Sequence, residues 1–237
     1  MAPEVAPRLA ELADRYALPS VATERLAVLL DLVAEEPSAI TSVRDPAEGV
    51  DVHIADSLVA LELPHVRAAR RVADIGSGGG FPGLALAVAL PGSHVALVES
   101  VGRKCAFLRS AVQSLELANV EVVNARAEAW PEGLNAHDLI TARALAPLPV
   151  LVEYAAPLLH IGGALVAWKG HRDAAEETDA AAAAASLGMS EPKAHRVSPF
   201  DGADARNLYL SSKVSLTPPN YPRRTGMARK RPIRASS

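Results

Sequence analysis

The spacing of apolar residues changes near residue 70 of the chain. Before that point apolar residues recur every three or four positions, as Leu26, Leu29, Leu30 and Val33 do. This spacing places them on one side of a helix, so the first part of the chain is predicted to form helices that each bury one face.

Two helix starts can be located within this first part. Ser20 can cap the helix that carries those leucines, because serine accepts hydrogen bonds from the free amides of a first turn. Asp45 is followed by Pro46 and, three residues after the cap, by Glu48, which predicts a second start.

From residue 71 short apolar strands alternate with helical stretches. Strands are expected at 72–75, 94–99, 120–124, 138–141 and 164–169, with two more at 193–197 and 207–214. Helices are expected to begin near Pro82, Gly102, Leu148 and Asp173. The alternation predicts an α/β fold whose mostly parallel sheet has helices on both faces.

The chain is expected to form one structural domain in three parts. Residues 1–65 are the N-terminal helices, 66–216 the core, and 217–237 a basic arm that the prolines at 217–222 predict to be extended.

Composition excludes several classes of protein. With 237 residues, 49% apolar and 22% charged, the chain is a globular protein and not a disordered one. Its longest apolar run, 84–90, is far below the roughly 18 residues of a membrane span. The single cysteine, Cys105, excludes an internal disulfide and a zinc site built on cysteine pairs, and it suits the cytoplasm. The seven histidines are scattered, so no metal site is expected.

Positive charge is concentrated at the C-terminus. The net charge is -3, but residues 205–237 hold eight of the 24 basic residues and no acidic one. The remaining 16 basic residues stand against 27 acidic ones, so residues 1–204 carry -11. A basic tail on an acidic body indicates either a local contact with a polyanion such as nucleic acid or a merely solvated tail.

A glycine-rich loop follows the first predicted strand. Its glycines allow a tight turn against which a ligand can lie, and Glu99, 25 residues after Asp74, can accept both hydroxyls of a ribose. Asp74, Gly76, Gly78 and Gly80 match the spacing D-x-G-x-G-x-G. The dinucleotide spacing G-x-G-x-x-G is also present, but it is a weak signal alone.

The acidic residue favours a methyl donor over a dinucleotide. A carboxylate two residues before the first glycine is expected to face the ligand, where it suits the ammonium group of S-adenosylmethionine and would repel a pyrophosphate. Pro82, just inside the helix, also removes an amide that a pyrophosphate could use.

Seven motifs in this order resemble the glucose-inhibited division protein B family (RsmG). They are TSVRDP at 41–46, HIADSL at 53–58, DIGSGGGFPG at 74–83, RAE at 126–128, TARA at 141–144, KG at 169–170 and YPRRTG at 221–226. The resemblance implies a Rossmann-like class I S-adenosylmethionine-dependent methyltransferase with a seven-stranded sheet and an N-terminal helical extension. It also implies methylation of guanine N7 in 16S ribosomal RNA.

The chain departs from the family pattern near its start. The family has a Trp-Asn pair and then Asn-Leu-Thr, whereas residues 33–41 lack the tryptophan and have Ala39 in place of the second asparagine. Val52 stands where a basic residue is usual. These changes concern the N-terminal helices and not the cofactor loop.

The site residues follow from the loop and the resemblance. The cofactor-binding set is Asp74, Gly76, Gly78, Gly80, Phe81, Glu99, Ser100, Val101, Ala127, Glu128 and Arg143. The candidates for RNA phosphate contacts are Arg103, Lys104, Lys169, Arg223 and Arg224, although each can also be a solvated surface charge. His53 and Asp56 match the family too, but their spacing is also that of a helix-packing pair, which we favour.

The chemistry agrees with a ring-nitrogen target. Guanine N7 has a lone pair and no proton, so no general base is needed, and the sequence shows no nucleophile–base pair. The alternatives are a methyltransferase for a small molecule or protein, and a non-catalytic RNA-binding module. We expect a cytoplasmic monomer whose partner is 16S ribosomal RNA or the small ribosomal subunit, with no membrane and no metal.

Overall fold

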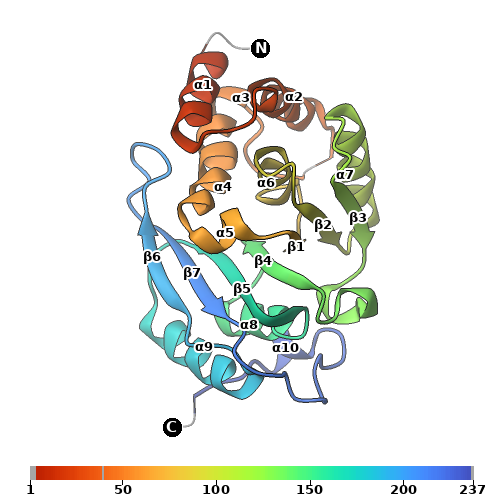
Figure 1. Ribbon diagram of the computed structural model, residues 1–237, viewed down its shortest axis with the longest axis vertical. Helices are drawn as coiled ribbons and strands as arrows, with labels where there is room; N and C mark the ends of the chain where they lie inside the picture. Colours follow the sequence, from red (N-terminus) through yellow and green to blue (C-terminus); the bar gives the residue numbers. More distant parts are fainter. Residues whose placement is uncertain (1–3, 39, 236–237) are drawn as a thin grey trace.

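Seven strands form one sheet in the computed structural model, which describes residues 4–38 and 40–235. The strands are β1 (Arg71–Ile75), β2 (His94–Glu99), β3 (Val120–Asn124), β4 (His137–Arg143), β5 (Leu159–Lys169), β6 (Lys193–Val197) and β7 (Arg206–Ser212). Their order is β3-β2-β1-β4-β5-β7-β6, as Figure 1 shows. β1 to β5 are parallel, and β7 is antiparallel to both β5 and β6. The predicted fold class is confirmed.

Helices cover both faces of the sheet and enclose two apolar cores (Figure 1). One face is covered by α1 (Val5–Tyr16), α2 (Ala22–Glu35), α3 (Pro46–Gly49), α4 (Asp56–Leu58), α5 (Pro64–Ala68), α6 (Gly83–Ala89) and α7 (Gly102–Ser114). A π-helix (Val50–Ala55) joins α3 to α4, and a 3-10 turn (Val59–Glu62) leads to α5. The other face is covered by α8 (Leu148–Ala155), α9 (Ala174–Leu187) and α10 (Met227–Lys230).

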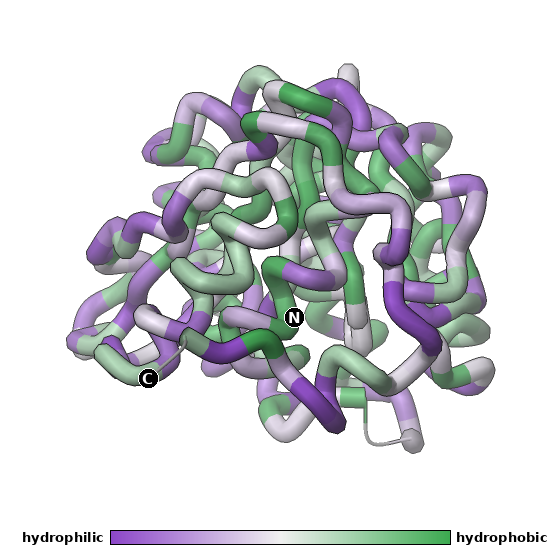
Figure 2. The backbone as a smooth tube through the Cα atoms, turned by 90° about the horizontal axis from the view of Figure 1, so that it is seen from below, coloured by the Kyte–Doolittle hydropathy of each residue, from purple (hydrophilic) through white to green (hydrophobic). Residues whose placement is uncertain are grey.

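The two-core arrangement follows from the sequence pattern. Central parallel strands are buried on both sides, so they read as nearly continuous apolar runs. Figure 2 shows apolar residues along the inner segments and polar residues along the outer loops. None of the helices in residues 4–38 and 40–235 is long and apolar enough to cross a membrane.

Side-chain caps mark the observed starts of α3 and α9. The Asp45 carboxylate accepts the Glu48 amide, and Asp173 accepts the amides of Ala175 and Glu176, as expected for caps. The predicted Ser20 cap is wrong, because α2 has Val21 at its cap position and no side-chain cap bond.

Two predictions about extended segments also need correction. β5 begins at Leu159 and not near residue 164, because a bulge in β5 between Leu159 and Ala164, opposite His137 and Leu139 of β4, lets pairing continue past two glycines. The C-terminal arm is not extended throughout, since it contains α10 and buries Ala228. Ala39 lies outside the described residues.

Candidate functional site

The glycine loop leaves the carboxyl end of β1 through three left-handed residues. Gly76, Gly78 and Gly80 have φ angles of 71°, 55° and 92°, which strain any residue with a Cβ atom. A Cβ at Gly76 would lie 2.6 Å from the Leu145 side chain, whereas one at Gly78 would meet no atom closer than 3.7 Å. The loop is therefore closed at Gly76 and open to a ligand at Gly78.

Asp74 lies near the end of β1, two residues before Gly76 of this loop. Its side chain is buried, and it accepts hydrogen bonds from the Thr141 hydroxyl (2.8 Å) and the Gly83 amide (3.1 Å). Burial raises the pKa of the carboxyl to about 6. Both carboxylate oxygens tie β1 to β4 and to the start of α6, and the place of Asp74 in the cofactor-binding set stays a prediction.

Glu99 ends β2 and supports the loop from the neighbouring strand. One carboxylate oxygen accepts the Gly78 amide (3.0 Å), and the other accepts the Val101 amide (2.8 Å). The Ser100 hydroxyl, 3.5 Å from one of these oxygens, makes only a long contact. Since an ionised carboxylate can accept about four hydrogen bonds, Glu99 keeps capacity for the two hydroxyls of a ribose. Ser100 and Val101, directly after it, are exposed at the same edge.

The remaining cofactor candidates divide between two places. Ala127 and Glu128 lie in a 3-10 turn (Ala127–Ala129) after β3, the strand that pairs with β2, so they join the Glu99 side of the loop. Arg143 ends β4 and lines a pocket beside Phe81 of the loop. All these residues follow or end parallel strands, and parallel strands bring their carboxyl ends to one edge of the sheet, so the residues lie at the same edge as the glycine loop.

The pocket is a cavity of about 510 Å³ that several segments line. Its polar and aromatic residues are Thr41, Ser42, His53, Asp56, Arg143, Trp168, Lys169 and Arg206. Arg143 and Lys169 end parallel strands, whereas Arg206 begins β7. Because β7 is antiparallel to β5, its first residue lies at the same edge as their last residues.

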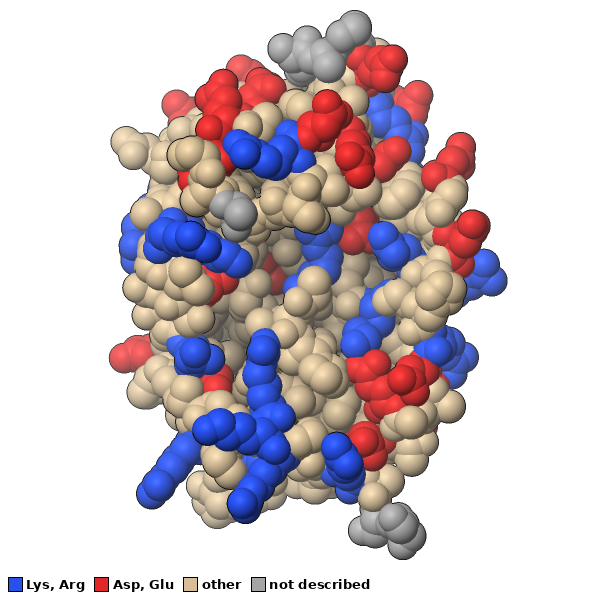
Figure 3. Space-filling model, turned by 180° about the vertical axis from the view of Figure 1, so that it is seen from behind, with Lys and Arg blue, Asp and Glu red and all other residues tan. Residues whose placement is uncertain are grey.

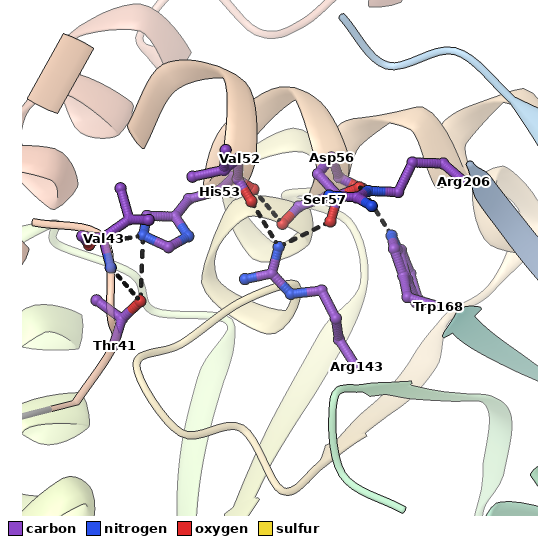
Figure 4. A network of polar contacts seen from close by, with 9 residues as sticks. All are labelled: Thr41, Val43, Val52, His53, Asp56, Ser57, Arg143, Trp168 and Arg206. Atoms are coloured by element: carbon purple, nitrogen blue, oxygen red, sulfur yellow. Dashed lines mark hydrogen bonds and ion pairs between the residues drawn. The ribbon is translucent and has the colours of Figure 1, made fainter. Parts of the chain in front are cut away.

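Asp56 is the centre of the polar network in this pocket (Figure 4). Its carboxylate contacts Arg143 at 2.9 Å and Arg206 at 3.2 Å, and only 8% of its side chain is exposed. Its carbonyl oxygen accepts the Trp168 indole N–H at 2.6 Å. Arg143 also donates to the carbonyl of Val52 in the π-helix, whose geometry frees carbonyls for such side-chain donors. The carboxylate is thus fully engaged by two guanidinium groups.

His53 closes the side of the pocket nearest the glycine loop. Its ring stacks on Phe81 with centroids 4.5 Å apart and planes at 9°, and its Nε2 lies 3.0 Å from the Val43 carbonyl oxygen. Burial lowers the pKa of His53, and a carbonyl partner requires Nε2 to carry the proton of the neutral ring. The Arg143 guanidinium lies over the other ring of this stack, 5.6 Å from the Phe81 centroid. Phe81 therefore joins the loop to the pocket.

The predicted phosphate contacts have different surroundings. Arg103 and Arg224 are exposed, as such a contact needs. Lys104 lies at the cofactor loop, where its ammonium would be 4.0 Å from a Cβ at Gly78. Lys169 pairs with Glu176 at 2.6 Å.

Arg223 is not a free surface charge. Its Nε donates to the buried Glu153 carboxylate at 2.6 Å. This corrects the expectation that Arg223 is available for a phosphate, because the ion pair anchors the arm instead.

Figure 3 shows a face of the molecule that is hollowed near its middle and has Lys and Arg side chains around the hollow. Acidic side chains gather toward the upper edge and the lower right of this view.

Sequence reasoning missed Arg206 and Trp168 as pocket residues and assigned His53 and Asp56 to packing. Trp168 precedes the Lys-Gly motif and could have been found from it, whereas nothing local marks Arg206. Among residues 4–38 and 40–235 there is no group of three His, Cys, Asp or Glu that could hold a metal ion.

The chain is similar to proteins of one named family. The family model GidB, described as rRNA small subunit methyltransferase G, matches residues 23–204. A relative named ribosomal RNA small subunit methyltransferase G in Rubrobacter xylanophilus is 42% identical over 201 residues, which cover 82% of this chain and 77% of the relative. A relative of the same name in Roseiflexus castenholzii is 44% identical over 197 residues, which cover 82% and 83%.

The fold is similar to that of solved methyltransferases. The crystal structure of a SAM-dependent methyltransferase from Aquifex aeolicus matches with a TM-score of 0.54 and 18% identity, and the match covers 76% of this chain and 99% of that one. At this identity the likeness shows the Rossmann-like class I fold alone.

Proposed function

The chain belongs to the GidB family of rRNA small subunit methyltransferase G proteins, and we propose that it transfers a methyl group from S-adenosylmethionine to N7 of one guanine in 16S ribosomal RNA. The observation that carries the proposal is the pairing of an open glycine loop with a basic pocket through the Phe81–His53 stack. A nucleoside cofactor on one side and a nucleotide on the other would meet at that stack.

The loop residues fit a nucleoside cofactor. The space above Gly78 is free of side chains close enough to exclude a ligand, and Glu99 keeps capacity for two ribose hydroxyls. Ala127 and Glu128 lie beside Glu99, where the adenine would follow the ribose. When bound, S-adenosylmethionine supplies a methyl group on a positively charged sulfur.

The pocket residues support a nucleophile that has no proton to lose. Asp56 is engaged by Arg143 and Arg206 and is therefore not a free base. The Nδ1 atom of the neutral His53 has no hydrogen-bond partner among the described residues, but burial lowers the pKa of the ring and makes it a weak base. Guanine N7 needs no base, and the protein's contribution is to align the ring with the methyl group and to exclude water. Arg143 and Arg206 share the single Asp56 carboxylate, and the positive charge left over favours a ligand that carries phosphates.

The exposed basic residues suit the RNA backbone around that nucleotide. Arg103 and Arg224 are exposed, and each phosphate contact would add to a salt-dependent affinity. Since ribosomal subunits are the substrate in this proposal, the protein would act in the cytoplasm, as a monomer.

A methylation assay tests the proposed function. The protein is incubated with radiolabelled S-adenosylmethionine and either small ribosomal subunits that lack the modification or free 16S ribosomal RNA. The labelled position is then mapped by borohydride and aniline cleavage, which cuts at N7-methylated guanine. We expect label at a single guanine N7.

Two variants sharpen this assay. Arg206→Ala removes a pocket guanidinium and is expected to lower the rate, whereas Arg196→Ala, an exposed arginine on the adjacent strand β6, is expected to leave it unchanged. Bound cofactor with no label on either RNA would refute the ribosomal substrate and favour a small molecule or a protein instead.

A further inference from the structure

The C-terminal arm, residues 217–235, is docked on the molecule and is not a free tail. Tyr221 and Ile233 pack against the core beneath α8, and Ala228 of α10 is buried. Arg223 secures the arm through its ion pair with Glu153 of α8. Figure 1 shows α10 beside α8 at the lower edge of the sheet.

The docked arm holds two loops of the cofactor edge at once. The Arg229 guanidinium donates to the Leu145 carbonyl oxygen at 2.5 Å, in the loop after β4. The Gly226 amide donates to the Glu128 carboxylate at 2.9 Å, in the turn after β3. These two loops approach the glycine loop from different strands, and the arm connects them.

The loop after β4 needs such support because its backbone is strained. Ala144 has a φ angle of 52°, in the left-handed region that costs a residue with a Cβ atom on the order of 1 kcal/mol. This turn directs Arg143 into the pocket and lays the Leu145 side chain on Gly76. A hydrogen bond to the Leu145 carbonyl stabilises this conformation directly after the strained residue.

We propose that the arm is part of the cofactor site, and that Arg229 is a positioning residue that fixes Leu145 against the glycine loop. This inference rests on the proposed function, because it takes the glycine loop as the place where S-adenosylmethionine binds. It gives the basic arm a task distinct from contact with RNA. Loss of the Arg229 bond would free the strained turn, and cofactor affinity would fall with no loss of a direct contact.

The test compares two neighbouring residues of equal charge on α10. Arg229→Ala removes the bond to Leu145, whereas Lys230→Ala removes an exposed charge that makes no side-chain hydrogen bond within the described residues. Dissociation constants for S-adenosylmethionine are measured by calorimetry on the full chain, and melting temperatures are recorded beside them. We expect Arg229→Ala to weaken cofactor binding at least fivefold and Lys230→Ala to change it less than twofold.

A rescue variant separates positioning from general stability. Gly in place of Ala144 relieves the left-handed strain, so A144G added to Arg229→Ala should recover part of the lost affinity. The same affinity for Arg229→Ala and Lys230→Ala would overturn the inference, and so would weaker binding that A144G leaves unchanged. If Arg229→Ala does not fold, Arg229→Met, which keeps an aliphatic side chain but has no donor for the Leu145 carbonyl, takes its place with the same expectations. Failure of the unmodified protein to bind S-adenosylmethionine would instead overturn the proposed function.

Discussion

Replacement of Glu99 tests the cofactor site most directly. In Glu99→Ala the ribose loses the acceptor of both its hydroxyls, and the amides of Gly78 and Val101 lose theirs. The two amides can turn to water, because Val101 is exposed and the Gly78 turn is open. The main loss therefore falls on cofactor binding and not on folding.

The size of this loss follows from two hydrogen bonds to a charged acceptor. Net values of about 0.5–1.5 kcal/mol for each give a total of about 1–3 kcal/mol, which is roughly a 5- to 150-fold rise in the dissociation constant. Glu99→Gln keeps one acceptor oxygen and no charge, so it should lose about half as much free energy.

Calorimetric titration with S-adenosylmethionine measures these changes at a temperature where each variant is folded. Glu121→Ala on the next strand is the matched control, since its carboxylate is exposed and makes no hydrogen bond within the described residues. If Glu99→Ala binds within twofold of the unmodified protein while it remains folded, the ribose assignment is refuted.

Three further predictions concern burial and charge. The pKa of Asp74 is raised from 3.8 to about 6 by burial, so the stability linked to its protonated form is fully present below pH 3.8 and is lost as the pH rises through 6. Urea unfolding measures the free energy of unfolding of the unmodified protein and of Asp74→Asn. The value for the unmodified protein minus that for Asp74→Asn should fall by ~3 kcal/mol between pH 4 and pH 7. A difference that does not change with pH would contradict the burial argument. Asp56→Ala leaves Arg143 without its buried partner, so it should lower the free energy of unfolding in urea by about 3 kcal/mol. Arg206→Ala should change that free energy by less than about 1 kcal/mol, because 40% of the Arg206 side chain is exposed. Equal effects of these two variants would show that Asp56 is not held mainly by Arg143. The third prediction concerns filter binding to 16S ribosomal RNA. Arg103→Ala, which removes an exposed charge, should reduce the slope of log affinity against log salt concentration by about 1. Lys104→Ala should leave this slope unchanged, because the Lys104 ammonium lies at the glycine loop. The reverse outcome would assign the phosphate contact to Lys104.

The sequence by itself determined the class of the fold and the place of the cofactor loop. Both depend on local pattern: apolar runs alternate with helical spacing, and Asp74, the glycines and Glu99 lie at the ends of the first two strands. Because parallel strands end at one sheet edge, correct strand ends were enough to bring Glu99 to the loop. The caps at Asp45 and Asp173 could also be predicted, since capping involves residues within one turn.

Only the tertiary structure decided the pocket and the roles of individual charges. Arg206 meets Asp56 across 150 residues because β7 runs antiparallel, and nothing in its local sequence indicates that contact. Asp74 is held by the Thr141 hydroxyl, 67 residues away along the chain, and by the Gly83 amide, 9 residues away. Arg223 looked like a surface charge until the buried Glu153 was placed beside it. Which charged residues pair depends on which distant segments of the chain meet in the fold. Hydrophobic periodicity predicts the helices, the strands and their buried faces, but it does not predict these charge pairs.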